Sequence, residues 1–147
     1  MSTARPSPER RAAYPHFLSI TTRWADNDQY GHVNNVVYYQ FFDTVVNRYL
    51  IEAGALDVAG GEAIGLVVET ACRYFAPVSF PDTVHAGLRV VHVGTSSVRY
   101  EIGLFANDND DAVAQGHFVH VYVDRVGRRP VPLSAALRAA LAPLEPR

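Results

Sequence analysis

The sequence contains no lysine, and all thirteen of its basic residues are arginine. Schiff-base chemistry, pyridoxal phosphate attachment and the phosphate-binding P-loop each require a lysine side chain, so these three classes are excluded. The formal net charge of −2 argues against nucleic acid as a partner, because binding to a phosphate backbone needs clustered positive charge.

Cysteine is nearly absent as well. The single Cys72 cannot form an internal disulfide, which is typical of a reducing compartment, and its apolar neighbours favour a buried small side chain over a nucleophile. Neither a CxxC pair nor a histidine-rich spacing indicates a metal site, so we expect no metal and no separate cofactor.

Long apolar runs are also missing. No segment approaches the ~20 apolar residues that a membrane span needs, and residues 1–13 lack the apolar stretch of a signal peptide. We therefore expect a cytoplasmic protein without a membrane partner, whose residues 1–13 form a disordered tail.

Residues 14–147 contain no repeat or linker, and 48% of the whole sequence is hydrophobic, which favours one globular domain. Residues 34–53 predict a long helix that ends before Gly54, a residue typical of helix ends. The polar residues of this helix form one narrow stripe and the rest of its surface is apolar. Such a helix must be enclosed by other parts of the chain.

Five segments have the composition of β-strands, one before the long helix and four after it. They are residues 17–24, 64–74, 84–93, 97–106 and 113–124. Short turns join the later strands and predict an antiparallel meander, followed by a short helix over residues 134–141 with Ser134 as its N-cap. The pattern therefore predicts an α+β fold in which one curved antiparallel sheet of about five strands wraps around a long central helix.

The segment RWADNDQYGHVNN, residues 23–35, combines two carboxylates, a glycine and the predicted start of the long helix. Asn34 is a favourable N-cap residue, and the exposed N–H groups of a helix start stabilise negative charge. Thioester hydrolysis needs such donors for the oxyanion, together with a carboxylate that attacks the carbonyl or activates a water. The same residue types are common in turns and caps, and composition alone favours that structural interpretation.

The pattern RW-x-D-x-D-x-x-GHVNN-x-x-Y resembles the signature of the 4-hydroxybenzoyl-CoA thioesterase group of hotdog-fold acyl-CoA thioesterases. The later segments RYFAPVSFPD and GTSSV follow the order of that family. The resemblance implies the hotdog fold and hydrolysis of an acyl-CoA, with an acyl-carrier-protein thioester as an open alternative. It implies Asp28 as the catalytic carboxylate and the backbone N–H of Asn35, beside Asn34, as the oxyanion donor. Asp26 falls on a structural position.

Other residues of the motif are open to two interpretations. His32 is either an acid or base near pH 7 or, as the resemblance favours, a residue that holds the loop by hydrogen bonding. Tyr30 and Gly31 adjoin the expected substrate site, where Tyr30 either lines the acyl pocket or simply packs. In the family member that acts on an aromatic acyl-CoA, the turn after the third strand carries basic residues that bind the nucleotide phosphates. The corresponding turn here, residues 94–97, is uncharged. The phosphates would then bind Thr95 and Ser96, or arginines elsewhere.

An open antiparallel sheet leaves exposed edges, and the resemblance implies that two sheets pair edge to edge in a homodimer, or in a homotetramer of dimers. Glu69, Thr70 and Arg73 are then candidates for a wall that faces the helix start of the other subunit. Two other functions stay open. One is a hydratase or dehydratase that acts on acyl thioesters through His32, and the other is a non-catalytic acyl-thioester binding module.

Overall fold

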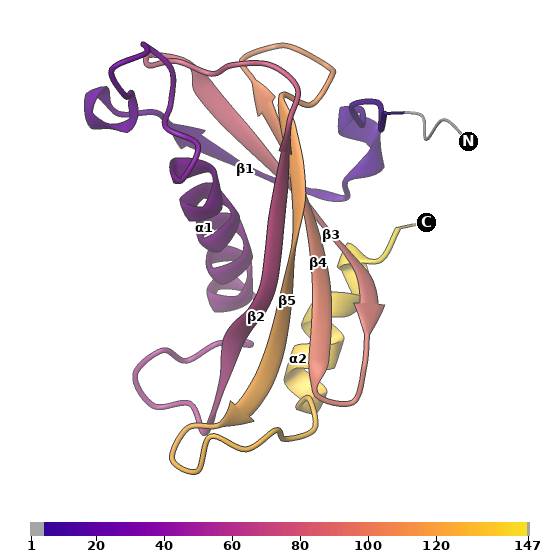
Figure 1. Ribbon diagram of the computed structural model, residues 1–147. Coiled ribbons are helices and arrows are strands. Elements are labelled where there is room, and N and C mark those ends of the chain that lie inside the picture. Colours follow the sequence, from indigo (N-terminus) through magenta and orange to yellow (C-terminus); the bar gives the residue numbers. More distant parts are fainter. Residues whose placement is uncertain (1–4, 147) are drawn as a thin grey trace.

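The computed structural model describes residues 5–146 and consists of one five-stranded antiparallel sheet with a long helix against one face (Figure 1). We call the face toward this helix the inner face and the opposite one the outer face. The strands are β1 (His16–Thr21), β2 (Ala63–Tyr74), β3 (Thr83–Val93), β4 (Ser97–Ala106) and β5 (Ala114–Asp124). The α-helices are α1 (Val37–Glu52) and α2 (Ala135–Leu141), and the 3-10 turns are η1 (Arg11–Ala13), η2 (Trp24–Asp26) and η3 (Ala142–Leu144). The predicted curved sheet around a central helix is confirmed.

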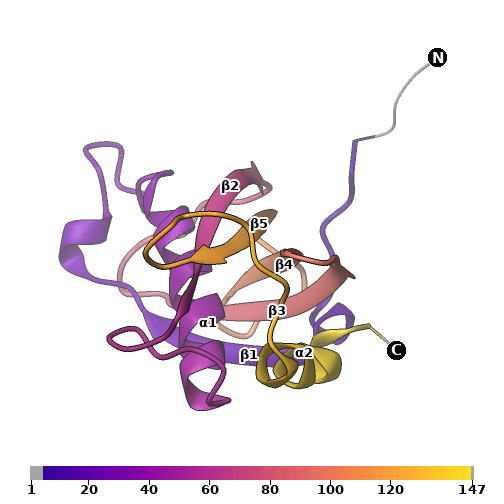
Figure 2. The same ribbon diagram turned by 90° about the horizontal axis from the view of Figure 1, so that it is seen from below.

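Helix α1 buries one side against the sheet and leaves the other side exposed (Figure 2). The buried residues recur every three to four positions, as a helix face requires: Val37, Tyr38, Phe41, Phe42, Val45, Val46 and Leu50. Ile51 is 49% exposed, so the prediction of a helix enclosed on nearly all sides is wrong for the outward side. The helix ends just before Gly54, whose φ of +73° belongs to the left-handed region that favours glycine.

The helix begins three residues later than the sequence predicts. Residues 34–37 form a turn, in which Asn34 accepts hydrogen bonds from Val36 N–H through Oδ1 (3.1 Å) and from Val37 N–H through its carbonyl (2.9 Å). Asn34 therefore uses its capping chemistry in a turn that leads into the helix, and the helical residues start at Val37.

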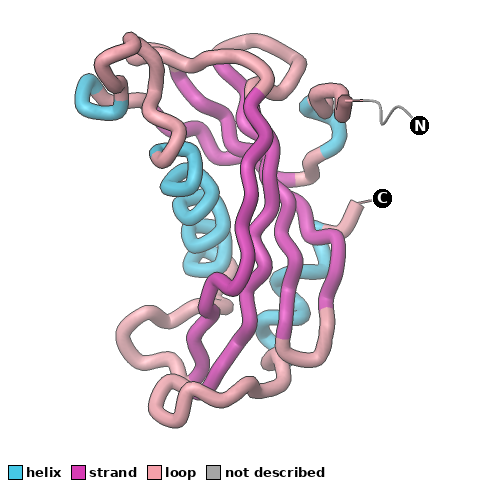
Figure 3. Tube along the Cα trace, viewed as in Figure 1, coloured by secondary structure: helices cyan, strands magenta, loops and turns pink. Residues whose placement is uncertain are grey.

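The strands lie in the order β1-β3-β4-β5-β2 (Figure 3). β3, β4 and β5 form a meander, whereas β2 pairs with β5 and not with β3, so the prediction of a four-strand meander is wrong for β2. Residues 75–82 connect β2 to β3 across three strand spacings of ~4.8 Å each, which eight extended residues span easily. β2 is consequently a twelve-residue edge strand, with a bulge between Val67 and Glu69.

Residues 9–14 attach to the outer face of the sheet, which differs from the predicted disordered tail over residues 1–13. Glu9 accepts a hydrogen bond from Ala112 N–H (2.9 Å), and the ring of Tyr14 lies over Gly87 and Gly103. A Cβ at Gly103 would stand 2.5 Å from that ring, so the contact requires glycine there. Residues 1–4 of the predicted tail lie outside the described residues.

The end of the chain closes the core beside β3 and β4. Ser134 caps α2 as predicted, since its Oγ accepts a hydrogen bond from Leu137 N–H (3.1 Å). Leu137 and Leu141 are buried in the main apolar cluster. Among residues 5–146, no helix is both long enough and apolar enough to cross a membrane.

Candidate active site

A small hairpin of residues 26–34 carries the predicted catalytic carboxylate to the start of α1. Asn27 and Val33 form an antiparallel bridge. Asp28 N–H donates to His32 O (2.9 Å), and Asn34 N–H donates to Asp26 O (2.9 Å). At the tip, Gly31 has a φ of +83°, a conformation that other residues adopt only with strain. The hairpin holds Asp28 and the residues before α1 in a fixed relation.

The segment that connects β2 to β3 anchors this hairpin. Val33 N–H donates to Val78 O (2.7 Å), and Ser79 Oγ donates to Gly31 O (2.8 Å). Asn27 Oδ1 accepts from Phe80 N–H (3.0 Å). Sequence reasoning missed this anchor, because nothing in the local pattern pairs residues about fifty positions apart. The only indication in the sequence was the segment RYFAPVSFPD, which occurs at the same place along the chain as in the family that the sequence resembles.

The two carboxylates of the motif have different surroundings. Asp26 is only 3% exposed, and its oxygens accept from the backbone N–H of Arg23 (2.7 Å) and from its guanidinium (2.8 and 3.1 Å). Asp28 is half-buried, and its Oδ1 accepts one hydrogen bond, from Tyr30 N–H (2.8 Å). Within the described chain we find no partner for Asp28 Oδ2. Both carboxylate oxygens of Asp26 are thus used in hydrogen bonds within the chain, whereas one oxygen of Asp28 is available.

The backbone just before α1 has a free donor at Asn35. The N–H groups of Val36 and Val37 are both bonded to Asn34. Asn35 is exposed, and its carbonyl accepts from Tyr74 Oη (2.9 Å), but no acceptor for its N–H occurs among residues 5–146. Asn35 N–H is therefore available for the predicted role of oxyanion donor, which stays a prediction, and Asn35 precedes the helix and is not part of it.

The remaining motif residues face the solvent in a single chain. His32 is exposed, and it holds the hairpin through its backbone carbonyl. Tyr30 is 89% exposed, so within one chain it neither packs nor lines a pocket. The structure brings Asp28, Tyr30, Gly31, His32 and Asn35 together on one loop, and it leaves this loop open on its outer side.

The fold agrees with comparisons to known proteins. The family model of the thioesterase-like superfamily matches residues 22–141, which include the hairpin, α1, four of the strands and α2. The chain belongs to the thioesterase-like superfamily. This membership makes it a thioester hydrolase with the hotdog fold, as the sequence predicts.

Two solved structures share enough sequence to be informative. The PA5185 protein of Pseudomonas aeruginosa strain PAO1 is 57% identical, with a TM-score of 0.93, over 96% of this chain and 98% of that one. A thioesterase from Thermus thermophilus, solved in complex with coenzyme A and Zn, is 32% identical, with a TM-score of 0.75, over 90% of this chain and 96% of that one. No curated protein matches the chain.

A more distant structure supports the fold alone. The 1,4-dihydroxy-2-naphthoyl-CoA thioesterase Slr0204 of Synechocystis is 17% identical, with a TM-score of 0.78, over 85% of this chain and 93% of that one. The two chains thus share a fold at low sequence identity.

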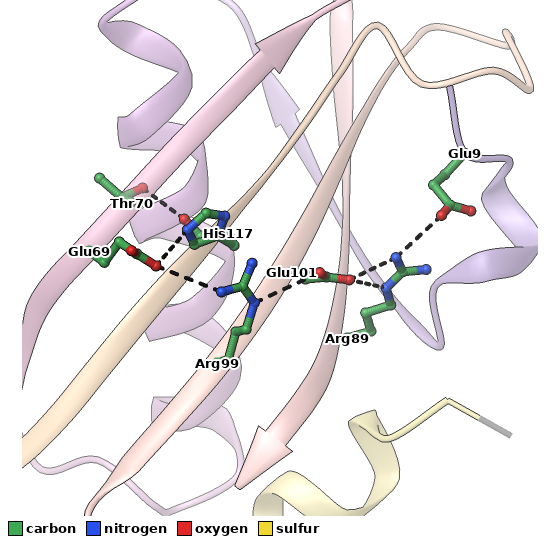
Figure 4. A network of polar contacts seen from close by, with 7 residues as sticks. All are labelled: Glu9, Glu69, Thr70, Arg89, Arg99, Glu101 and His117. Carbon is green, nitrogen blue, oxygen red and sulfur yellow. Dashed lines mark hydrogen bonds and ion pairs between the residues drawn. The ribbon is translucent and has the colours of Figure 1, made fainter. Parts of the chain in front are cut away.

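Glu69, Thr70 and Arg73, which were predicted to form a wall facing the helix start of another subunit, do not all lie on the same face of β2. Glu69 lies on the outer face, where its carboxylate contacts His117 Nε2 (3.0 Å) and Arg99 (3.7 Å) (Figure 4). Arg73 lines an outer-face hollow of about 650 Å³. Thr70 pairs with Phe118 on the inner face. Within one chain, Glu69 and Arg73 therefore do not face the helix start, and their role toward a second subunit stays a prediction.

Thr95 and Ser96 lie at the end of the sheet opposite to Asp28. Their carbonyls accept hydrogen bonds from Leu133 N–H (2.9 Å) and Tyr122 N–H (2.8 Å), so both residues hold the turn between β3 and β4. Asp28, by contrast, follows Asn27, whose Oδ1 accepts a hydrogen bond from Phe80 N–H (3.0 Å), three residues before β3 begins. One chain does not bring Thr95 or Ser96 to the predicted catalytic loop.

Three hollows stand out on the described part of the chain, and neither Asp28 nor Asn35 lines any of them. Burial raises the pKa of Cys72 to about 11, which makes its thiol a poor nucleophile near neutral pH. Residues 5–146 contain no group of three or more metal-ligating side chains. The predicted loop therefore has carboxylate and donor chemistry, and it lies outside these three hollows.

Proposed function

We propose that this thioester hydrolase acts on acyl-CoA, with Asp28 as nucleophile or general base and Asn35 N–H as the oxyanion donor. The observation that carries the proposal is a contrast on one short loop between groups that are fully hydrogen-bonded and groups that have no hydrogen-bond partner. Asp26 has every oxygen bonded, whereas Asp28 Oδ2 and Asn35 N–H have no partner among the described residues. The thermophilic relative solved with coenzyme A supports CoA as the thiol part of the substrate.

Two chemical routes are consistent with this arrangement. In one, Asp28 attacks the thioester carbonyl, expels the CoA thiolate and forms an anhydride that water then hydrolyses. In the other, Asp28 removes a proton from a water that attacks the carbonyl. Both routes develop negative charge on the carbonyl oxygen, where one well-placed N–H donor is worth about 3–4 kcal/mol. His32 then has a structural role through its carbonyl, and Tyr30, Gly31 and Asn34 shape the entrance.

We propose further that the enzyme is a homodimer formed through the β2 edge. Eight of the twelve residues of β2 are exposed, including Leu66, Val67 and Val68 (37%, 46% and 60%). A long, exposed, apolar edge strand is a site for pairing with another chain. A twofold axis would pair the two β2 strands antiparallel and bring Thr70 and the partner's Thr95–Ser96 turn toward the open side of the Asp28 loop.

Thiol release tests the catalytic proposal. We expect the purified protein to release CoA from at least one member of a panel of short, long and aromatic acyl-CoAs. An acyl-carrier-protein thioester in the panel tests the alternative carrier. A hydratase would instead change the absorbance of an enoyl-CoA without releasing thiol, and a binding module would retain the thioester unchanged. Isotope transfer from H₂¹⁸O into Asp28 in a single turnover would favour the anhydride route.

The assembly has its own test. Val68→Asp places a charge in the proposed interface while leaving the chain's own hydrogen bonds in place. We expect sedimentation to show a dimer for the wild type and a monomer for this variant, with hydrolysis lost in the monomer. Val91→Asp is the matched control, since Val91 is an exposed valine at the bulge of β3, three strands away from β2, and it should leave the dimer intact. A monomeric wild type with full activity would contradict the dimer.

A further inference from the structure

A second feature of the inner face lies far from the Asp28 loop, beside the last turns of α1. It is a cavity of about 190 Å³ between α1, the start of β2 and the end of β5. The residues that line it are mostly apolar: Asn47, Leu50, Leu56, Val58, Ile64, Gly65, His120, Tyr122 and Arg125. About thirteen residues of α1 and its entry turn separate Asn35 from this cavity, which at ~1.5 Å per residue is roughly 20 Å.

His120 is the unusual residue of this wall. Its side chain is 3% exposed, and its Nε2 has no hydrogen-bond partner among the described residues. The nearby hydroxyls of Tyr100 and Tyr122 bond to each other (3.0 Å) and not to the imidazole. Leaving a buried polar group without a partner costs about 1–3 kcal/mol, and an apolar residue of similar size would avoid that cost. A buried polar group of this kind calls for an explanation, such as a bound ligand.

The imidazole is in the correct state to bind a neutral polar group. Burial lowers the pKa of His120 to about 4, so the ring is uncharged near neutral pH. A neutral imidazole has one N–H donor and one nitrogen acceptor. It therefore suits a hydroxyl or carbonyl group, and it has no charge with which to attract a phosphate or carboxylate.

Gly65 keeps the cavity open. A Cβ at this position would lie 3.2 Å from His120 Nδ1 and 3.1 Å from Tyr122 Cε1. Any other residue here would therefore press against both rings and fill the space between β2 and α1. The cavity volume is close to that of a single aromatic ring, since an apolar cavity of ~150 Å³ holds benzene.

The geometry of β2 connects this cavity with the catalytic loop of a second copy. At one end of β2, Tyr74 bonds to Asn35 O; at the other end, Gly65 lines the cavity. When two β2 strands pair antiparallel about a twofold axis, the Tyr74 end of each copy adjoins the Gly65 end of the other. Asp28 and Asn35 of one copy then lie beside the cavity of its partner.

We propose that the cavity at Gly65 and His120 of one copy receives the acyl group whose thioester is cleaved at Asp28 of the other copy, and that His120 hydrogen-bonds a polar group on that acyl chain. This inference rests on the proposed hydrolase and its β2 dimer. It names the substrate class as a compact acyl group of about ring size with a hydroxyl or carbonyl distant from the thioester. Long unbranched saturated chains exceed the cavity.

Matched substrate pairs test the role of His120. We compare CoA thioesters that differ only by one hydroxyl on a ring-sized acyl group, and we measure the ratio of kcat/KM within each pair. The wild type should prefer the hydroxylated member by about 10–100-fold, because an unpaired buried group penalises the other. His120→Phe should abolish this preference, and His120→Gln should keep part of it.

His117→Ala is the control, because His117 lies on the outer face of the same strand and contacts Glu69; it should retain the full preference. Circular dichroism and the thermal midpoint verify that each variant is folded. A wild type that hydrolyses thioesters without the preference, or a His120→Phe enzyme that retains it, overturns the inference and leaves the proposed function standing. Absence of hydrolysis with every thioester overturns the proposed function itself.

Mixed dimers test whether the two parts of the site come from different copies. Asp28→Asn chains are mixed with an equal amount of His120→Phe chains and allowed to associate at random. Under our proposal about half of the remaining Asp28 sites face a partner with His120 and regain the preference for the hydroxylated substrate. If the cavity served the Asp28 of its own chain, every active site would carry the His120→Phe substitution and the mixture would show no preference.

Discussion

The two faces of β5 each carry a histidine, and the two histidines differ in their hydrogen bonding. His117, on the outer face, bonds to Glu69 at one end of a network that continues through Arg99, Glu101 and Arg89 (Figure 4). His120, on the inner face, is buried among aromatic rings, and its Nε2 has no partner within residues 5–146. The difference teaches that residue type and strand position do not distinguish a histidine with a hydrogen-bond partner from one without, whereas the folded structure does.

The same distinction separates the two aspartates of the hairpin. Asp26 is almost fully buried and bonded on both oxygens, and Asp28 is half-buried with one oxygen available. A group whose partners lie within its own chain stabilises the structure, and a group without them is available to a substrate. The following experiments test this rule at the two pairs, in order of decreasing expected effect.

The largest effect belongs to Asp28. Asp28→Asn should lower kcat by about 10²–10⁴-fold, because it removes the nucleophile or general base, while the free energy of unfolding changes by less than about 0.5 kcal/mol. Thiol-release kinetics and chemical denaturation measure the two quantities. Equal kcat values for wild type and variant would remove Asp28 from the mechanism.

The next effect is the pH dependence of stability that His120 causes. Its pKa is about 4 in the folded chain, against a usual value of 6.5, so the unfolded chain binds the extra proton first. The contribution of neutral His120 is fully present above pH 6.5 and is lost as the pH falls toward 4, by about 3 kcal/mol in total.

Denaturation from pH 7 to pH 4 should therefore show a smaller loss of stability in His120→Phe than in the wild type. The other titrating groups are shared by both proteins and cancel in the difference between them. Parallel curves for the two proteins would show that His120 is not buried in its neutral form.

Asp26 should affect stability and not chemistry. Asp26→Asn keeps the shape of the side chain but weakens its bonds to Arg23, which should cost about 1–3 kcal/mol of unfolding free energy. Thermal denaturation measures the cost, and kcat of the folded protein at low temperature should stay within a few-fold of wild type. A loss of kcat as large as that of Asp28→Asn would reverse the assignment of the two aspartates.

The smallest effect is expected on the outer face. His117→Ala removes one contact to Glu69, whose side chain is 60% exposed, and such surface pairs are worth about 0–1 kcal/mol. Urea denaturation at neutral pH should show this small change. A cost comparable with that of Asp26→Asn would mean that the outer-face network is more than a solvated surface.

Much of the fold was predictable from local patterns. Alternation located β4 over residues 97–106 to the residue, and the apolar periodicity found α1. The start of α1 was misplaced because Asn34 has the same chemistry in a turn as in a cap. The position of β2 beside β5 depends on contacts between residues far apart in sequence, which local periodicity does not contain.

The motif selected Asp28 and Asn35 as candidate site residues, and their catalytic roles stay predictions. Each has a group without a partner among residues 5–146, but the surroundings of the loop were not predictable. The anchor at Ser79, the bonded state of Asp26 and the isolation of His120 arise only after distant segments come together. His120 in particular sits in an ordinary alternating strand, so no spacing distinguishes it from His117.

The bulge of β2 at Val68 affects how many further chains can pair with the exposed β2 edge. A flat edge strand of twelve residues could accept copy after copy, as in a fibril. The extra residue gives the edge a local twist, so that pairing is favoured in one register and an antiparallel partner covers the whole edge. The opposite edge, β1, has only six residues. In the proposed β2 dimer, growth would therefore stop when two chains have paired, so that the edge that permits association would also limit it.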